Sequence, residues 1–266
     1  MSCQQLWAIQ TKLTQEDSTK YLVDAFVYLG LNWGAFPFPP FVGQVPNFHW
    51  DGPVVYYGST ALVKRVSEDP SLRTSALFFN AETHRPDWYG PRFGEAYLNR
   101  EAKTSTVTEF FDVDRDDDEQ FFIRPNSGLK IFAGKVFTVS EFDEFIELSR
   151  GNTLLSSDTP IVFGPVKKIY REFRTWIVDG EVAAAVQYKQ GSKMLPSAEV
   201  PKEVVEFAAR QAKVCSPSPV FVLDVAETPD DHAVIEINCF HSSGFYLTEQ
   251  ILDVVAEVSN YVKRTG

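Results

Sequence analysis

The sequence predicts an α/β protein with α+β character, in which a small α/β unit precedes a larger region of strands and helices. In residues 1–75, strand-like and helix-like runs alternate, which is typical of small α/β units. From residue 120 onwards, strands of alternating character are joined by short turns, and amphipathic helical runs follow them. The chain has 266 residues, 44% hydrophobic and 23% charged, so it is able to bury a core.

The first part contains two predicted strands and two predicted helices. Residues 5–9 (QLWAI) and 53–59 (PVVYYGS) have the apolar character of buried strands. Thr14 with Asp17 forms a capping pair for a helix that we expect to end at Gly30, and Ser59 or Thr60 caps the helix that follows. Residues 81–119 are less regular and predict a connector with one short helix.

The second part begins with strands at 120–125 and 136–139, and its elements continue to residue 264. Ser140 is expected to cap the helix at 141–150, with Asp143 at the capping-box position. The run 169–189 predicts a β-hairpin, because alternating residues flank an Asp-Gly turn. Further strands are expected at 160–166 and on both sides of the polar turn in 219–238, and helices at 201–214 and 249–264.

Composition excludes several classes of partner. A formal net charge of −11 argues against a surface for nucleic acid or an anionic membrane, although a pocket inside an acidic protein can still be basic. The acidic run 112–120 lacks the glycine and the spaced ligands of a calcium loop, so we interpret it as a solvated linker. Three cysteines form no disulfide framework, and no apolar run has membrane-spanning length. We therefore expect a cytoplasmic protein.

Oxygen-bearing side chains interrupt two apolar strands near the end of the chain. Because side chains alternate along a strand, Glu236 and Asn238 are expected to lie opposite Ile235 and Ile237. If the two strands pair across their turn, Asp224 joins Glu236 and Asn238 on one face. Two carboxylates and an amide oxygen suit Mg²⁺ that bridges nucleotide phosphates. A solvent-facing strand with ordinary polar residues is the other interpretation of the same pattern.

Basic residues accompany two earlier strands. Arg124 ends one strand, and Lys130 follows a flexible turn at 126–128 whose backbone N–H groups suit phosphate oxygens. On the hairpin, Glu172 and Arg174 share a face, where a carboxylate can bind ribose and an arginine can bind a phosphoryl group. An ordinary turn and a surface ion pair are the alternatives that the sequence leaves open.

These motifs follow one another in an order that resembles the ATP-grasp superfamily of carboxylate–amine ligases. The order is Arg124 to Lys130, then Glu172 to Arg174, then Asp224 to Glu236. The resemblance covers roughly residues 120–263 and is greatest to the clade named for two arginines and a lysine. It implies a pre-grasp α/β domain with connector at 1–105 and an ATP-grasp domain at 106–266. In that domain the central subdomain is 120–166 and the C-terminal subdomain is 167–266.

The resemblance also implies roles for individual residues. ATP would bind at a mobile loop, at a hinge and at a ribose-binding acid: Arg124, Ser127, Gly128, Lys130, Pro165, Val166, Lys167, Lys168 and Glu172. The magnesium ligands would be Asp224, Glu236 and Asn238, and the substrate loop would be His241, Ser242, Ser243 and Gly244. Arg124, Lys130 and Arg174 would be catalytic. The chain departs from the family at Val222, where an arginine often precedes the metal-binding Asp.

The activity that this resemblance implies is ATP-dependent amide formation through an acyl-phosphate, with Mg²⁺ as cofactor and release of ADP and phosphate. The partners would be ATP, a carboxylate and an amine, which would be a small molecule, a peptide or a protein tail. Two other hypotheses are a nucleotide-binding regulator with the same fold and a phosphotransferase. His241 is open to orienting a substrate, to deprotonating the amine, or to a structural role. Lys189 and Lys193 are open to binding an acidic substrate or to simple solvation.

Overall fold

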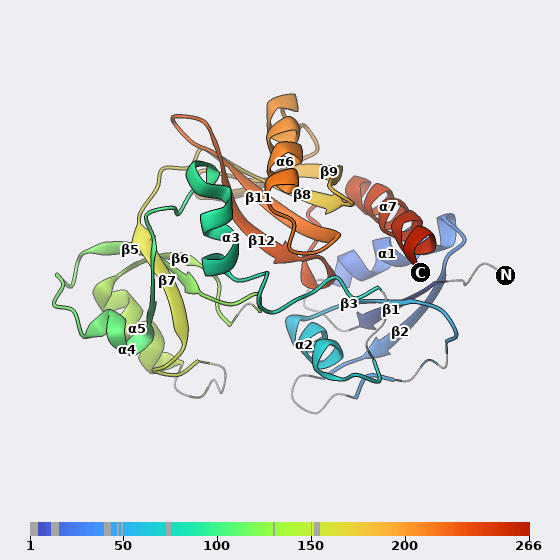
Figure 1. The fold of residues 1–266 in the computed structure, drawn as a ribbon, viewed down its shortest axis with the longest axis horizontal. Helices are drawn as coiled ribbons and strands as arrows, with labels where there is room; N and C mark the ends of the chain where they lie inside the picture. The colour runs from blue at the N-terminus through green and yellow to red at the C-terminus, as the bar shows by residue number, and fades with distance from the viewer. Residues whose placement is uncertain are drawn as a thin grey trace.

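The structure is a computed structural model that describes residues 5–11, 16–39, 44–46, 48, 50–72, 76–129, 131–149, 151 and 155–266. Its strands form three sheets (Figure 1): a three-stranded sheet in the order β2-β1-β3, a four-stranded sheet in the order β4-β7-β5-β6, and a five-stranded sheet in the order β10-β9-β8-β11-β12. The elements of the first unit are β1 (Leu6–Thr11), α1 (Glu16–Tyr28), β2 (Asn32–Pro37), β3 (Val54–Tyr57) and α2 (Thr60–Glu68).

The N-terminal unit is a parallel sheet with its helices packed beside it, as the alternating pattern predicts. Gly30 has a φ of +62°, a conformation that glycine adopts freely, and it follows the end of α1 as expected. The Ser59 side chain accepts from the N–H of Leu62 and caps α2. Strand β2 was not predicted. The predicted cap of Thr14 with Asp17 lies outside the residues whose side chains the structure describes.

The connector contains more structure than the one short helix predicted from its sequence. It forms α3 (Pro86–Phe93), a 3₁₀ turn η1 (Gly94–Ala96), β4 (Lys103–Thr106) and α4 (Val107–Phe111). The prediction was wrong because β4 and α3 depend on partners that are distant in sequence: β4 pairs with β7, and α3 packs on the five-stranded sheet. The division of the chain at residue 105 stays a prediction, and it falls inside β4.

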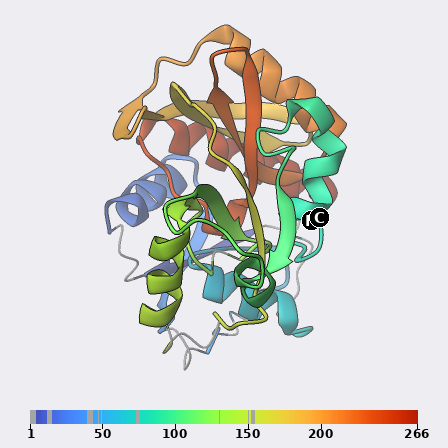
Figure 2. The same cartoon turned by 90° about the vertical axis from the view of Figure 1, so that its left-hand side faces the viewer.

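The four-stranded sheet is antiparallel, and a helix lies against it (Figure 2). Phe142 and Phe145 of this helix contact Phe137 of the sheet. It contains β5 (Gln120–Pro125), β6 (Lys135–Thr138) and β7 (Pro160–Pro165), and α5 (Val139–Leu148) lies between β6 and β7 in the chain. The predicted cap of α5 was wrong by two residues. Thr138, rather than Ser140, accepts from the N–H of Glu141, and Glu141, rather than Asp143, completes the capping box.

The five-stranded sheet contains the predicted hairpin and the two strands that carry the oxygen-bearing side chains. Its strands are β8 (Arg171–Val178), β9 (Glu181–Gln190), β10 (Lys193–Ser197), β11 (Val220–Glu227) and β12 (His232–Cys239). Asp179 and Gly180 have φ values of 52° and 82°, which suit the tight hairpin turn between β8 and β9. The other elements are α6 (Lys202–Val214), the 3₁₀ turn η2 (Phe240–Ser242) and α7 (Glu249–Thr265). Strand β10 was not predicted.

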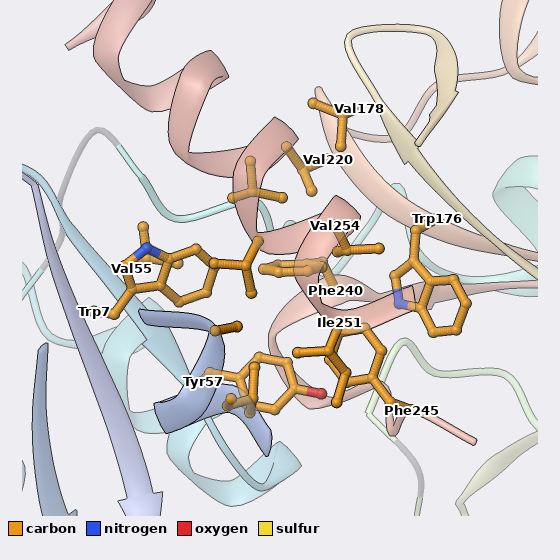
Figure 3. Close-up of a cluster of buried hydrophobic side chains, with 14 of the residues drawn as sticks. Trp7, Val55, Tyr57, Trp176, Val178, Val220, Phe240, Phe245, Ile251 and Val254 are labelled. Carbon is orange, nitrogen blue, oxygen red and sulfur yellow. The ribbon is translucent and has the colours of Figure 1, made fainter. Parts of the chain in front are cut away.

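One face of this sheet is divided between an apolar core and the candidate site. Trp176 of β8 and Val220 of β11 belong to one apolar cluster that also contains Val254 of α7 and Trp7 and Val55 of the N-terminal unit (Figure 3). Further along the same two strands, this face carries Arg174 and Asp224 in place of apolar residues. The N-terminal unit therefore covers the apolar half of this face. The polar half, with Arg174 and Asp224, borders a pocket.

The acidic run at 112–120 and the length and hydropathy of the helices bear on two of the expectations from composition. The acidic run is largely exposed, and in the described part of the chain no group of three or more His, Cys, Asp and Glu residues could hold a metal ion. Among the same residues, no helix is both long enough and apolar enough to cross a membrane.

The corrected cap of α5 leads to a stability prediction. We expect Thr138→Ala to lower the free energy of unfolding by about 1 kcal/mol, because the first turn of α5 loses its side-chain acceptor. Ser140→Ala is the matched control and should change it far less. Urea unfolding followed by circular dichroism measures both variants, and equal losses would contradict the assigned cap.

Candidate functional site

A pocket of about 700 Å³ lies between the four-stranded and five-stranded sheets. Strands β5 and β6 contribute to it from one side and β8, β9, β11 and β12 from the other. Its lining includes five basic and three acidic side chains: Arg124, Lys135, Lys167, Arg174, Lys189, Glu172, Asp224 and Glu236. The pocket is therefore basic within a chain whose formal net charge is −11, and it suits an anionic ligand.

The deepest charges in the pocket form a buried ion pair across two neighbouring strands. Asp224 lies directly opposite Arg174 in the pairing of β11 with β8. Arg174 donates from Nε to Oδ1 at 2.9 Å and from Nη2 to Oδ2 at 2.8 Å, a bidentate geometry. Burial opposes the charge of Arg174, but the charge and hydrogen bonding of Asp224, together with Tyr246 and Tyr188, outweigh this effect and hold the guanidinium pKa above its ordinary value.

Asn238 links this pair to a second one. Its Nδ2 donates to Asp224 Oδ2 at 3.0 Å and to Glu236 Oε1 at 2.9 Å, and Arg124 Nη2 lies 2.8 Å from Glu236 Oε2. These two guanidiniums, two carboxylates and one amide therefore form a continuous network of hydrogen bonds and ion pairs across β8, β11, β12 and β5. The convergence of the three predicted metal ligands is confirmed, whereas their role stays a prediction.

A β-bulge changes which side chains of β12 face the pocket. Asp224 pairs with Glu236, but Val225 pairs with Val234, so Ile235 is the extra residue. Ile235 lines the pocket beside Glu236, whereas Ile237 is buried in the core on the opposite face. The prediction that Ile235 and Ile237 point the same way was wrong, because simple alternation fails at a bulge.

A second bulge surrounds Glu172 with hydrogen-bond donors. Glu172 pairs with Lys189 and Phe173 with Gln187, so Tyr188 is the extra residue of β9. Tyr188 Oη donates to Glu172 Oε2 at 2.5 Å, and Lys189 Nζ lies 2.7 Å from Oε1. Lys189 is therefore held by Glu172 at the pocket, whereas Lys193 is exposed on β10.

The glycine turn after β5 contributes unequally to the pocket. Arg124 and Ser127 line it. Gly128 instead packs against the connector, because a Cβ there would lie 2.6 Å from the Cβ of His84. Close packing thus explains the glycine at this position without a phosphate. Lys130 lies outside the described residues.

The predicted hinge reaches the pocket at one residue. Lys167 lines the pocket and pairs with Glu101 at 2.5 Å. Pro165, Val166 and Lys168 are not among the described residues that line it, and the Lys168 ammonium lies over the ring of Tyr170 instead.

The predicted substrate turn is fastened to the N-terminal unit. The Tyr57 hydroxyl donates to the carbonyl of Ser243, and the Gly58 N–H donates to the carbonyl of His241 at 2.8 Å. Ser243 Oγ donates to the carbonyl of Cys239 at 2.6 Å, and the carbonyl of Gly244 accepts from Arg174 Nη1 at 3.2 Å. The turn therefore contacts the ion pair through its backbone. Ser242 is half-buried beside it.

His241 is a buried structural residue, which corrects the substrate-binding role considered from sequence. Its Nδ1–H donates to the carbonyl of Tyr56 at 2.5 Å, and its Nε2 accepts from the N–H of Phe78 at 2.8 Å. Burial lowers its pKa from 6.5 to about 4, so the ring is neutral at physiological pH. Both nitrogens are used in joining the turn to Tyr56 of β3 and to Phe78 in the segment after α2.

The pocket-lining residues that sequence reasoning missed include the charged Lys135 and the polar Asn99, Tyr188 and Tyr246. The rings of Tyr188 and Tyr246 are stacked, with centroids 4.8 Å apart and an interplanar angle of 8°. Tyr188 is hidden from alternation by its bulge. Asn99 and Tyr246 lie in irregular segments, where no periodic signal indicates the direction of a side chain.

Two antiparallel sheets that hold a basic pocket between them define the ATP-grasp fold class. A family model for an ATP-grasp domain, family 3 of the clade named for two arginines and a lysine, matches residues 51–258, and the chain belongs to this family. This result confirms the family and the fold that the sequence motifs indicated. A search of the curated proteins found no match.

Solved structures agree on the fold. A RimK-domain ATP-grasp protein from Sphaerobacter thermophilus is 12% identical with a TM-score of 0.59, over 97% of this chain and 99% of that one. D-alanine–D-alanine ligase from Bacillus anthracis is 11% identical with a TM-score of 0.59, over 98% of each chain. The macrocyclase MdnC from Microcystis aeruginosa, bound to its precursor peptide, is 14% identical with a TM-score of 0.55, over 96% and 99%.

The neutral, buried His241 leads to a prediction about pH. Below about pH 6.5 the unfolded chain binds a proton at this histidine, whereas the folded protein does so near pH 4, so stability falls as the pH drops between these values. The expected slope from His241 is about 1.4 kcal/mol per pH unit. His241→Gln keeps a donor and an acceptor, and it should flatten the slope of the unfolding free energy measured with urea. His232→Gln, at a half-buried position on β12, is the control, and equal slopes in all three proteins would contradict the assignment.

Proposed function

We propose that the protein is an ATP-dependent, ADP-forming carbon–nitrogen ligase that joins a carboxylate to an amine through an acyl-phosphate. The observation that carries this proposal is the buried chain from Arg124 through Glu236, Asn238 and Asp224 to Arg174, which lies in a basic pocket of an ATP-grasp fold. A pure scaffold has no need to bury two carboxylates and two guanidiniums together, because each buried charge costs desolvation energy.

The residues present fit a magnesium ion. Asp224 and Glu236 supply carboxylate oxygens, and Asn238 now donates its Nδ2 to both, so turning its amide over presents an oxygen to the same point. Mg²⁺ prefers one or two carboxylates together with substrate phosphates, which agrees with a set of this size. When bound, the ion would neutralise negative charge on the phosphates.

The remaining charges would act on the phosphoryl group. An oxygen of the substrate carboxylate attacks the γ-phosphorus of ATP, and ADP departs with the electron pair of the broken bond. The amine nitrogen then attacks the carbonyl carbon, phosphate departs, and the amine proton is lost to solvent. Arg174, Arg124 and Lys130 would stabilise the transferring phosphoryl charge, and Glu172 would bind the ribose.

Arg174 would act without the arginine that often precedes the metal-binding Asp in this superfamily. Val222 occupies that position, is fully buried, and belongs to the apolar cluster with Trp176. A longer side chain at this position would meet that cluster before it reached the pocket. Arg174 reaches Asp224 from the neighbouring strand instead, which supports assigning the phosphoryl role to it.

A peptide or a small amino acid is the substrate class that the related structures support. One of them is a D-alanine–D-alanine ligase, and others are the ligase PsnB and the macrocyclase MdnC in complex with precursor peptides. The direct test mixes the protein with ATP, Mg²⁺ and pools of amino acids and peptides, and analyses the products by mass spectrometry. Amide formation gives ADP and a product lighter than its two precursors by one water. A phosphorylated acceptor would indicate a phosphotransferase, and nucleotide binding without product would indicate a regulator.

Glu236 is the sharpest test of the metal assignment. We expect Glu236→Gln to abolish magnesium-dependent ATP turnover and the magnesium-dependent part of ATP binding, because a neutral amide is a poor magnesium ligand. Glu227→Gln is the matched control, since Glu227 lies in the same sheet and pairs with Arg171 away from the pocket. Full activity of a folded Glu236→Gln protein would contradict the assignment.

Arg174 should matter more for turnover than for binding. We expect Arg174→Ala to reduce ADP release in the substrate screen at least a hundredfold while the Kd for ATP changes much less. Because this variant leaves buried Asp224 without its bidentate partner, Arg174→Lys serves as a second variant that keeps the charge but loses the geometry. Equal losses of turnover and binding would mean that Arg174 is a ground-state contact.

A further inference from the structure

Two tyrosine rings, those of Tyr188 and Tyr246, lie close to the guanidinium of Arg174. The guanidinium carbon lies 5.6 Å from the ring centroid of Tyr188 and 5.1 Å from that of Tyr246. Both distances are within the range of cation–π attraction. Both tyrosines line the pocket, so they border the space that a nucleotide would occupy.

Tyr188 is a fixed support in this arrangement. The bulge in β9 directs it into the pocket, and its hydroxyl donates to Glu172 at 2.5 Å. Its side chain is 8% exposed. Because the Tyr188 ring is held by its hydroxyl and by the backbone of β9, it fixes the position of the Tyr246 ring that stacks on it.

Tyr246 connects this support to the predicted substrate turn. It comes two residues after Gly244, whose carbonyl accepts from Arg174 Nη1. It stacks on Tyr188 at 4.8 Å, and it is half-buried. Arg174 is thus held by Asp224 at one edge, by Gly244 at another, and by the ring of Tyr246.

We propose that Tyr246 is a positioning residue for Arg174, holding the guanidinium at the pocket when it moves from Asp224 to a transferring phosphoryl group. This inference rests on the proposed function, since it assigns to Arg174 the phosphoryl charge of that reaction. The aromatic ring performs this role, and the hydroxyl is dispensable. Because Tyr246 follows the predicted substrate turn, a well-ordered conformation of that turn also fixes the position of the Arg174 guanidinium.

The test compares binding of ADP with binding of ADP plus aluminium fluoride, both with Mg²⁺, by calorimetry. Aluminium fluoride with ADP imitates the transferring phosphoryl group, so it reports on Arg174 without a known substrate. We expect Tyr246→Leu to weaken binding of the aluminium fluoride complex roughly three- to thirtyfold and binding of ADP less than twofold. Tyr246→Phe should restore the wild-type values, which a hydroxyl-dependent role would not allow.

Tyr21→Leu is the matched control, because Tyr21 is an exposed ring on α1 with the ammonium of Lys20 5.9 Å from its centroid. Should Tyr246→Leu fail to fold, Tyr246→Met removes the ring and leaves an unbranched, flexible side chain that adapts to the space. Wild-type affinity for the aluminium fluoride complex in a folded ring-deleted variant would overturn the inference, as would an equal loss for ADP alone.

These results are separable from a failure of the proposed function. If Arg174→Ala loses the aluminium fluoride complex but Tyr246→Leu does not, the proposed role of Arg174 stands and the inference about Tyr246 falls. If wild type binds ADP no more tightly with aluminium fluoride than without it, the phosphoryl role of Arg174 falls and the inference falls with it.

Discussion

The buried pair of Arg174 with Asp224 is the interaction on which the rest of the site depends. Removing two charges from water costs several kcal/mol for each ion, and a bidentate geometry with further hydrogen bonds is needed to offset that cost. Here the partners lie opposite each other on paired strands, and Asn238 and the carbonyl of Gly244 supply the additional bonds. The ion pair therefore requires this register of β8 against β11. A shift of one residue between the two strands would leave both charges buried and unpaired.

The same constraint explains how the N-terminal unit serves the site. Along β8 and β11, the face that carries the ion pair continues into Trp176 and Val222, which need an apolar partner. The N-terminal unit and α7 supply it (Figure 3). Tyr57 and Gly58 of the unit donate hydrogen bonds to carbonyls of the turn after β12, and His241 of that turn donates to the carbonyl of Tyr56. Packing on the apolar half of the β8 and β11 face thus fixes the turn after β12, whose backbone contacts Arg174 on the polar half.

Much of this arrangement was predictable from the sequence, and the failures have physical causes. Alternation along single strands correctly grouped Glu172 with Arg174, and Glu236 with Asn238, because regular strands have a period of two. It failed at Ile235 and Tyr188, where bulges place two consecutive residues at the pocket. Bulges depend on the pairing of two strands and leave no mark in either strand alone.

The connector was the least predictable part for a related reason. Strand β4 and helix α3 are stabilised by β7 and by the five-stranded sheet, which are far away in sequence. Asn99 reaches the pocket from this segment, and Gly128 is required by its packing on His84. Local sequence preferences do not contain such partners, whereas the order of the charged motifs along the chain was sufficient to indicate the family.

A calorimetric titration of ATP into the wild-type protein, with Mg²⁺ and with EDTA, is the most direct test of the nucleotide site. The basic pocket and the two carboxylates predict saturable, one-to-one binding that is at least tenfold tighter with Mg²⁺. Binding of equal strength in EDTA would contradict the magnesium site. No binding to the folded protein would contradict the central claim that this pocket is built for a nucleotide and its metal.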